Sequence, residues 1–255
     1  MEKCVLKKSW KSIVAILVTI LLWEGMVRIL AVQEWFLPAP SAILMEAKEV
    51  LPTFFPHVRA TFLLSVSGFL LGATVGLIVA VFLHLFKWVK EIFYPFLILS
   101  QNIPIIVLAP LLVIWLGFGA MPKLIVITLA CFFPIAMSTL EAFEQTDRKL
   151  YFYMEMMGAT KAQLFFKLEL PYAVPSMVAG FKIAATYSVM AAVISEWLGA
   201  QKGIGVFMTI ATSSYNTPRV FIAIIVTMLL SLLFFSGIVL CEKLLGRWQR
   251  KGDVT

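Results

Sequence analysis

Six long apolar segments restrict what this chain can fold into. They lie at residues 12–32, 61–86, 96–117, 122–140, 172–198 and 219–243. Each approaches or exceeds the roughly 20 residues that a helix needs to cross the hydrocarbon core of a bilayer. A backbone inside lipid must satisfy its own hydrogen bonds, and a helix does so within one segment. The sequence therefore predicts an all-α integral membrane protein with six transmembrane helices.

Composition excludes an ordinary soluble domain. Of the 255 residues, 61% are hydrophobic and 14% are charged, whereas soluble domains have about 45–50% apolar and 25% charged residues. The net charge of +7 does not indicate a nucleic-acid-binding protein, because no basic patch is interleaved with aromatic residues. We therefore expect a membrane environment and no nucleic-acid partner.

Lysine and arginine are distributed unequally between the two sides of the predicted bundle. Fourteen lie in the terminal segments and in the loops after the second and fourth spans, and five lie in loops on the other side. Because cytoplasmic loops collect these residues, both termini are predicted to be cytoplasmic. The predicted organisation is a short segment 1–11, one six-span transmembrane domain 12–245 and a tail 246–255. We expect the first span to stay uncleaved, since it is long for a signal peptide and no small-residue cleavage site follows it.

Residues 141–171 form the longest predicted cytoplasmic connection. A short helix is expected over residues 147–157. Gly158 follows it at the position of a left-handed C-terminal cap. A loop that only joined two spans would need neither feature, so this segment is predicted to have a structure of its own.

A second short helix should follow the glycine. Thr160 and, three residues later, Gln163 form a capping-box pattern, and Pro171 lacks a backbone donor and is expected to end the helix. Apolar residues recur with helical spacing at Leu164, Phe165 and Leu168. The resulting hairpin could lie on lipid headgroups or dock a soluble partner, and the residues alone favour neither.

This loop resembles the signature of bacterial ABC-importer permeases. That signature reads Glu-Ala-Ala, three residues, Gly, nine residues, Ile, any residue, Leu-Pro. Gly158 and the pair Leu170 and Pro171 have this spacing, with Leu168 in the Ile position. The Glu-Ala-Ala triplet is absent, and its positions hold Phe152, Tyr153 and Met154.

The resemblance extends over roughly residues 35–245, to the nitrate, sulfonate, taurine and thiamine-precursor branch of these permeases. It includes Leu-Pro-Ala-Pro-Ser at 37–41, the segments 102–104 and 110–115, and Glu-Trp-Leu-Gly at 196–199. It implies the type I ABC-importer permease fold and a homodimer in the bacterial inner membrane. The partners it implies are an ATP-binding-cassette ATPase subunit and an external solute-binding protein.

In that family a short cytoplasmic helix inserts into a cleft of the ATPase and transmits its closing motion to the membrane. The loop 141–171 would be this coupling element, and its second helix would lie partly against its own subunit and partly at the joint. The ATPase-coupling residues that the resemblance implies are Gly158, Ala159, Thr160, Leu164, Phe165, Leu168, Leu170 and Pro171.

The chain lacks the motifs of an enzyme. It has no Gly-x-x-x-x-Gly-Lys-Ser/Thr run to hold a nucleotide phosphate, and neither a His-Glu-x-x-His nor a Gly-x-Ser-x-Gly pattern. We expect no catalytic residue, no metal site and no cofactor bound by this chain. ATP and Mg would be bound by the partner ATPase.

Polar residues in or beside the spans are candidates for a translocation pathway. Glu196 closes the fifth span beside Trp197. An acid inside the membrane marks a functional site by default, although a Glu-Trp pair at the interface is also a common anchor. The other candidates are Gln101, Asn102 and Ser188. The glycines that follow Glu196 would let the chain re-enter the membrane as a short segment.

Other features of the spans have structural interpretations. Pro104 and Pro110 interrupt the third span, which predicts a kink or an unwound turn there. Lys182 lies near the cytoplasmic end of the fifth span, from which its side chain could snorkel to the headgroups. Close helix packing is predicted for three glycines on one face of the second span, namely Gly68, Gly72 and Gly76.

The expected function is therefore uptake of a small polar solute. Glu-Trp-Leu-Gly most resembles permeases for the pyrimidine precursor of thiamine, of the hydroxymethylpyrimidine type, and Trp197 could stack on a pyrimidine ring. Aliphatic sulfonates, taurine and nitrate are the alternatives within the class. An ATP-independent secondary transporter is the rival from another class.

Overall fold

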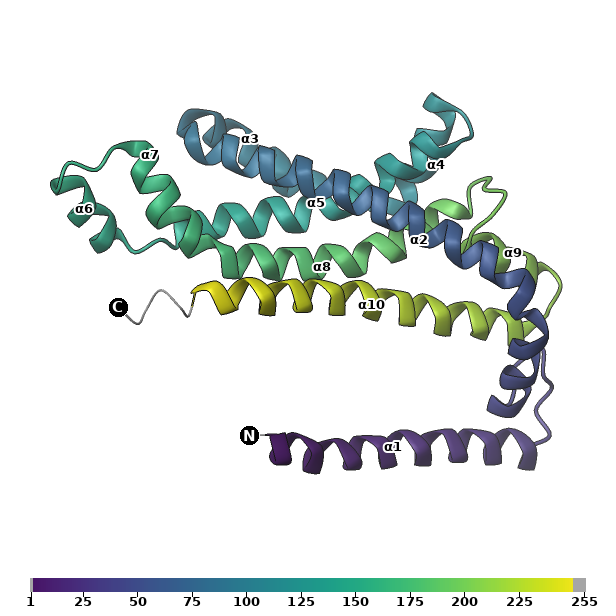
Figure 1. Cartoon of the computed structure of the whole chain (residues 1–255). Coiled ribbons are helices and arrows are strands. Elements are labelled where there is room, and N and C mark those ends of the chain that lie inside the picture. The colour runs from purple at the N-terminus through teal and green to yellow at the C-terminus, as the bar shows by residue number, and fades with distance from the viewer. Residues whose placement is uncertain (1, 250–255) are drawn as a thin grey trace.

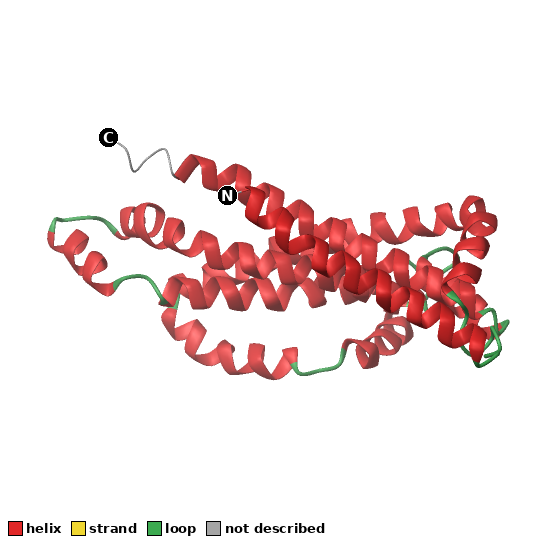
Figure 2. Cartoon of the chain, turned by 90° about the horizontal axis from the view of Figure 1, so that it is seen from below, coloured by secondary structure: helices red, strands yellow, loops and turns green. Residues whose placement is uncertain are grey.

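The computed structural model describes the backbone of residues 2–249 and the side chains of residues 10, 11 and 13–244. Within that range every element is a helix and no strand occurs (Figure 2). In chain order the elements are α1 (Glu2–Ile29), α2 (Pro40–Leu85), α3 (Lys87–Gln101), α4 (Ile105–Leu116), α5 (Ala120–Glu144), α6 (Arg148–Met156), α7 (Lys161–Leu164), the π-helical turn η1 (Phe165–Glu169), α8 (Leu170–Glu196), α9 (Ile204–Ser213) and α10 (Thr217–Gln249). The all-α prediction is confirmed. Residues 1 and 250–255 of the predicted terminal segments lie outside the described residues.

Four helical runs of the described chain are long and apolar enough to cross a membrane. They are α2, α5, the run Lys161–Glu196 and α10 as far as Leu244. The pair α3 and α4 is a fifth candidate if it counts as one bent span. The first predicted span corresponds to α1, which is not in this set, so the number of six stays a prediction.

Both ends of the described chain lie at the same end of the bundle. The start of α1 and the end of α10 are found on the side where α6 and α7 project (Figure 1). The loop between α4 and α5, the short helix α9 and the start of α2 lie at the opposite end (Figure 1). The assignment of the first end to the cytoplasm stays a prediction from the charge bias.

The third predicted span differs in extent and shape from the prediction. Its helix begins at Lys87, and the two halves meet at an angle of 99°. Pro104 has extended backbone angles and precedes α4. A proline lacks a donor and disfavours helical geometry in the residue before it, which accounts for the break. Pro110, by contrast, lies inside α4 without ending it.

The close helix packing predicted for the glycines of the second span is confirmed, and their partner helix is α5. A Cβ on Gly72 would come within 2.6 Å of the Cys131 Cβ and 2.7 Å of the Thr128 carbonyl oxygen. A Cβ on Gly68 would meet Ile127 at 2.4 Å. These glycines therefore allow the two helix backbones to approach closely, which is the packing that small residues give in membranes.

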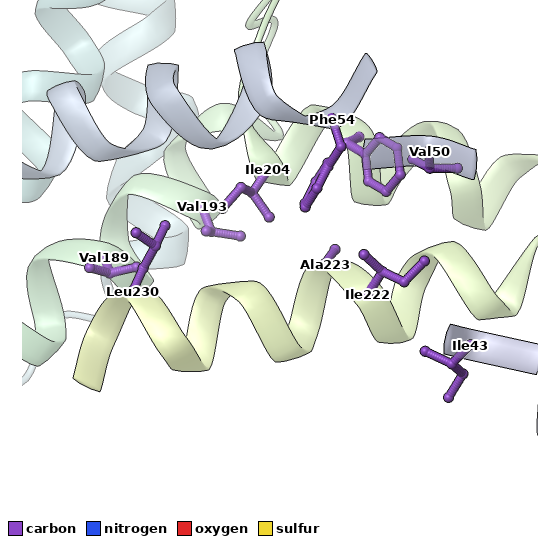
Figure 3. Close-up of a cluster of buried hydrophobic side chains, with 10 residues drawn as sticks. Ile43, Val50, Phe54, Val189, Val193, Ile204, Ile222, Ala223 and Leu230 are labelled. Atoms are coloured by element: carbon purple, nitrogen blue, oxygen red, sulfur yellow. The ribbon is translucent and has the colours of Figure 1, made fainter. Parts of the chain in front are cut away.

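An apolar cluster joins α2, α8, α9 and α10 near the end of the bundle that carries α9 (Figure 3). Its labelled side chains are Ile43, Val50, Phe54, Val189, Val193, Ile204, Ile222, Ala223 and Leu230. Phe54 and Phe207 are in contact, with ring centroids 4.4 Å apart. Burial of these residues fixes the short helix α9 against the long helices.

The prediction for Pro171 was wrong. Pro171 does not end the second helix of the hairpin, because α7, η1 and α8 form one helical run over Lys161–Glu196. Pro171 lies in the first turn of α8, where a missing N–H is tolerated. The Lys182 Nζ lies 2.7 Å from the Glu242 Oε2 of α10, and its extension to the headgroups stays a prediction.

Candidate functional site

The hairpin between α5 and α8 is built by two local capping motifs. The Asp147 side chain accepts a hydrogen bond of 2.8 Å from the Lys149 N–H and so caps the start of α6. At the other end the N–H of Ala159 donates to the Met154 carbonyl and the N–H of Gly158 donates to the Glu155 carbonyl. These two bonds form a Schellman motif. Gly158 has φ of +85°, the left-handed conformation that the motif requires.

The predicted capping box at the start of α7 is confirmed. The Gln163 N–H donates to the Thr160 Oγ1 at 3.3 Å, and the Thr160 N–H donates to the Gln163 Oε1 at 2.8 Å. Immediately after it, Leu164 is only 2% exposed, and Phe165 is also buried. Phe165 belongs to a cluster with Ala142, Phe143 and Ala173, with Leu170 packed against it. These predicted coupling residues therefore contact their own subunit.

The exposed apolar surface of the hairpin lies on α6 instead. None of the residues of α6 is buried. Large apolar side chains are exposed on α6 and at the residue after it: Leu150, Phe152, Tyr153, Met156 and Met157. Met156 is 80% exposed. Sequence reasoning did not single out this surface, although its residues recur four apart, which is helical spacing.

Glu196 lies in a buried network of hydrogen bonds at the other end of the bundle. Only 1% of the residue is exposed. The Thr61 Oγ1 of α2 donates to the Glu196 Oε1 at 2.7 Å, and the Gly205 N–H of α9 donates to the Glu196 Oε2 at 2.8 Å. Both carboxylate oxygens are thus engaged, and the end of α8 is tied to α2 and to the start of α9.

Further contacts secure the turn between α8 and α9. The Ile204 N–H donates to the Thr61 Oγ1 at 2.8 Å. The His57 Nδ1 lies 2.9 Å from the Gly203 carbonyl oxygen and 3.2 Å from the Gly203 nitrogen. A Cβ on Gly203 would lie 2.1 Å from the Glu196 Cδ, so this position has room only for glycine. Sequence reasoning did not find Thr61 or His57, because no local pattern connects them to residue 196.

The other predicted pathway residues do not form one cluster. Gln101 and Asn102 are exposed at the break between α3 and α4, and the Asn102 Nδ2 donates to the Ile98 carbonyl. Ser188 is fully buried, and its hydroxyl donates to the Ala185 carbonyl within α8. Trp197 is exposed at the end of α8. Among the described residues no group of His, Cys, Asp and Glu could hold a metal ion.

A chain of a solved ABC transporter has the same overall fold. The chain is similar to a chain of the crystal structure of an amino acid ABC transporter with histidines, with a TM-score of 0.65 over 78% of this chain and 97% of that chain, at 15% sequence identity. Residues 72–246 match the family described as binding-protein-dependent transport system inner membrane component, and the chain belongs to this family. It is therefore the membrane permease of an ABC importer, located in the bacterial cell membrane, as the signature loop predicted.

Two relatives cover most of the chain. The formylaminopyrimidine transport permease protein ThiX of Halalkalibacterium halodurans is 33% identical over 96% of this chain and 100% of that protein. The putative aliphatic sulfonates transport permease protein SsuC of Bacillus subtilis is 27% identical over 91% of this chain and 85% of that protein. Both names describe transport permeases, the second as a putative one.

Proposed function

We propose that this permease forms a homodimer that imports a pyrimidine precursor of thiamine, of the formylaminopyrimidine or hydroxymethylpyrimidine type. The observation that carries the substrate is the 33% identity to the formylaminopyrimidine permease, which extends over the full length of that protein. An external binding protein would deliver the solute. A separate ATPase subunit would bind ATP and Mg and drive transport, since this chain has no phosphate-binding loop.

The ATPase would dock on α6. Large apolar side chains are exposed on α6 and at Met157 directly after it, and no residue of α6 is buried. An amphipathic helix that lays its apolar face into a groove is a common mode of recognition. The Schellman motif and the capping box on either side of residue 158 would hold α6 in a fixed orientation to the rest of the hairpin. The buried residues Leu164 and Phe165 would then support the docking helix rather than contact the ATPase.

A charge on α6 tests this docking. Met156→Glu places a carboxylate on its most exposed apolar position, and burial of an unpaired charge in an interface is costly. We expect the affinity for the ATPase to fall at least about tenfold, measured as the amount that co-purifies with the tagged chain, with normal membrane insertion. Met121→Glu is the matched control, because Met121 is also exposed but lies in the first turn of α5, and α5 starts at the opposite end of the bundle (Figure 1). If the Met156→Glu chain retained the ATPase, α6 would belong on the headgroups.

The pathway candidates that stay exposed are Gln101, Asn102 and Trp197. We propose that Trp197 contacts the solute, because an indole can stack on a pyrimidine ring. Glu196 and Ser188 would act behind this surface, since their polar atoms are bonded within the chain.

Uptake of labelled hydroxymethylpyrimidine or its formylamino form tests the substrate. Cells would express this chain with its ATPase and binding protein, with excess taurine or alkanesulfonate as competitor. We expect ATP-dependent uptake that ignores both competitors. Uptake of sulfonate in place of the pyrimidine would overturn the substrate and leave the importer. Uptake without any ATPase, abolished by collapse of the proton gradient, would favour a secondary transporter.

A further inference from the structure

We propose that His84 and Glu169 form the joint through which movement of the α6–α7 hairpin reaches the transmembrane helices. The proposal rests on the proposed docking of an ATPase at α6. His84 lies in the last turn of α2, and Glu169 is the last residue of the π-helical turn η1. The His84 Nε2 lies 2.9 Å from the Glu169 Oε2, and the two side chains are 18% and 14% exposed.

The His84 ring also takes part in aromatic packing with α5 and η1. It stacks on Phe143 with ring centroids 4.4 Å apart and 28° between the planes. Phe165 lies 5.6 Å from Phe143 and 6.1 Å from His84, between ring centroids. Three elements therefore meet at one histidine. A displacement of η1 against α2 and α5 must move this ring or break its hydrogen bond.

The turn that carries Glu169 is also a point of weakness in the helical run. The Leu170 N–H donates to the Phe165 carbonyl, which is the longer spacing of a π-helix. Such turns inside α-helices often mark functional sites. Pro171 follows directly and cannot donate a backbone bond. The run Lys161–Glu196 can therefore bend here at lower cost than elsewhere in α8.

The His84–Glu169 bond has no counterpart in this part of the molecule. Among the described side chains, no other hydrogen bond or ion pair connects residues 147–169 to a long helix of the bundle; the remaining ones in that segment cap α6 and α7. Apolar contacts depend little on the relative orientation of two groups, whereas a hydrogen bond restricts both their distance and their angle. This pair would set the angle at which the hairpin leaves the bundle.

Two substitutions of His84 separate its ring from its hydrogen bond. His84→Phe keeps a ring to stack on Phe143 and cannot donate to Glu169. His84→Gln loses the ring and retains a nitrogen donor close to the position of Nε2. Glu169→Met removes the acceptor with a side chain of similar length. Lys182→Met is the matched control: it breaks the ion pair with Glu242, in the same helical run but with no contact to η1.

The first measurement is the amount of solute taken up per ATP hydrolysed, in proteoliposomes that hold the complete transporter. We expect His84→Phe and Glu169→Met to lower this ratio about tenfold, the size of effect that loss of one buried hydrogen bond to a charged group can give. His84→Gln and Lys182→Met should keep the ratio of the wild type. The double variant should be no worse than either single one, since both remove the same bond.

The second measurement requires no ATPase. Spin labels are attached at two exposed positions, Met157 directly after α6 and Ile78 on α2, and pulsed EPR measures the distance between them across the joint. The three native cysteines are first replaced. The labelled chain is diluted with unlabelled chain, so that the distance within one chain is measured. We expect a broadened distance distribution in His84→Phe and in Glu169→Met, and the narrow distribution of the wild type in His84→Gln and Lys182→Met.

The two readouts distinguish the possible failures. If the wild-type complex showed no ATP-driven uptake, the proposed function would fail while the distance measurement still tested the joint. If His84→Phe and Glu169→Met both kept the wild-type distance distribution, or the wild-type uptake per ATP in an active transporter, the joint would be overturned. Should one of the two variants fail to insert, the other decides, because each removes a different side of the bond.

Discussion

Replacement of Gly203 by alanine should destabilise the turn between α8 and α9 through two separate effects. Gly203 has φ of +146° and ψ of 159°, a region that is almost exclusive to glycine. In addition, the new Cβ would lie 2.1 Å from the Glu196 Cδ and 2.4 and 2.5 Å from its two oxygens. Both distances to oxygen are shorter than real contacts allow, so the carboxylate must move away.

The magnitude follows from these two effects. Strained backbone angles of this kind cost about 1–3 kcal/mol. A displaced Glu196 would lose the bond from the Thr61 Oγ1 or from the Gly205 N–H, and a buried polar group left without its partner costs about 1–3 kcal/mol. We expect a loss of about 4 kcal/mol in the free energy of unfolding. At about 2–4 °C per kcal/mol, the apparent Tm should fall by about 8–16 °C.

The assay is the apparent Tm of purified protein in detergent, from the folded fraction that survives heating. Gly237→Ala is the control, because Gly237 lies in a helix and a Cβ added there would meet no neighbouring atom within 4 Å. That variant should melt within about 2 °C of the wild type. If Gly203→Ala melted with the control, the reasoning about this turn would be refuted. Glu196→Ala should reduce the additional effect of Gly203→Ala, since it removes the clash and leaves only the strain.

Two further predictions concern other glycines. Gly158 has φ of +85°, but a Cβ there would meet no neighbouring atom, so Gly158→Ala should lower the free energy of unfolding by only about 1–2 kcal/mol. Gly158→Pro cannot adopt this φ and loses the hydrogen bond to the Glu155 carbonyl, so it should abolish uptake while the protein is still inserted. Equal uptake by the two variants would contradict this. Gly72→Leu should prevent close approach of α2 and α5 because Cys131 and the Thr128 carbonyl occupy the space, and folded protein recovered from membranes should fall strongly; a wild-type yield would be the contrary result.

Features that depend on a few neighbouring residues could be predicted from the sequence. The fourth span was expected at 122–140 and α5 covers Ala120–Glu144, because a long apolar run defines it even though Pro134 lies inside the helix. The cap at Gly158 and the capping box at Thr160 were also found, since each motif lies within six residues of chain. The resemblance to the permease signature used the same local spacing.

Features that depend on distant contacts could not be predicted. The helix α2 begins at Pro40 and includes Pro52 and Pro56, whereas the hydropathy of the sequence indicates a span only from about residue 61. A local rule treats these prolines as helix breakers, but packing against other helices compensates for them. The pair Lys182–Glu242 was missed for the same reason: its two residues belong to different helices. Which face of the hairpin is exposed also depends on the end of α5, whose Phe143 covers Phe165.

Glu24 near the end of α1 and Glu196 at the end of α8 show why a charge in a membrane sequence need not line a pathway. The residues that precede α2 and α9 are Ala39 and Gly203, and neither has a side-chain acceptor to cap its helix. In each case a glutamate near the end of the preceding helix supplies one: Glu24 accepts from the Ser41 N–H at 3.0 Å, and Glu196 accepts from the Gly205 N–H at 2.8 Å. A carboxylate satisfies unpaired donors there and interacts favourably with the helix dipole. By contrast, α6 and α7 begin with side chains that cap them locally. The unpaired backbone N–H groups at the start of a helix are therefore sufficient to explain a buried glutamate at the end of the preceding span. A pathway role for Glu196 requires an effect of its substitution on transport that exceeds the effect of losing this cap.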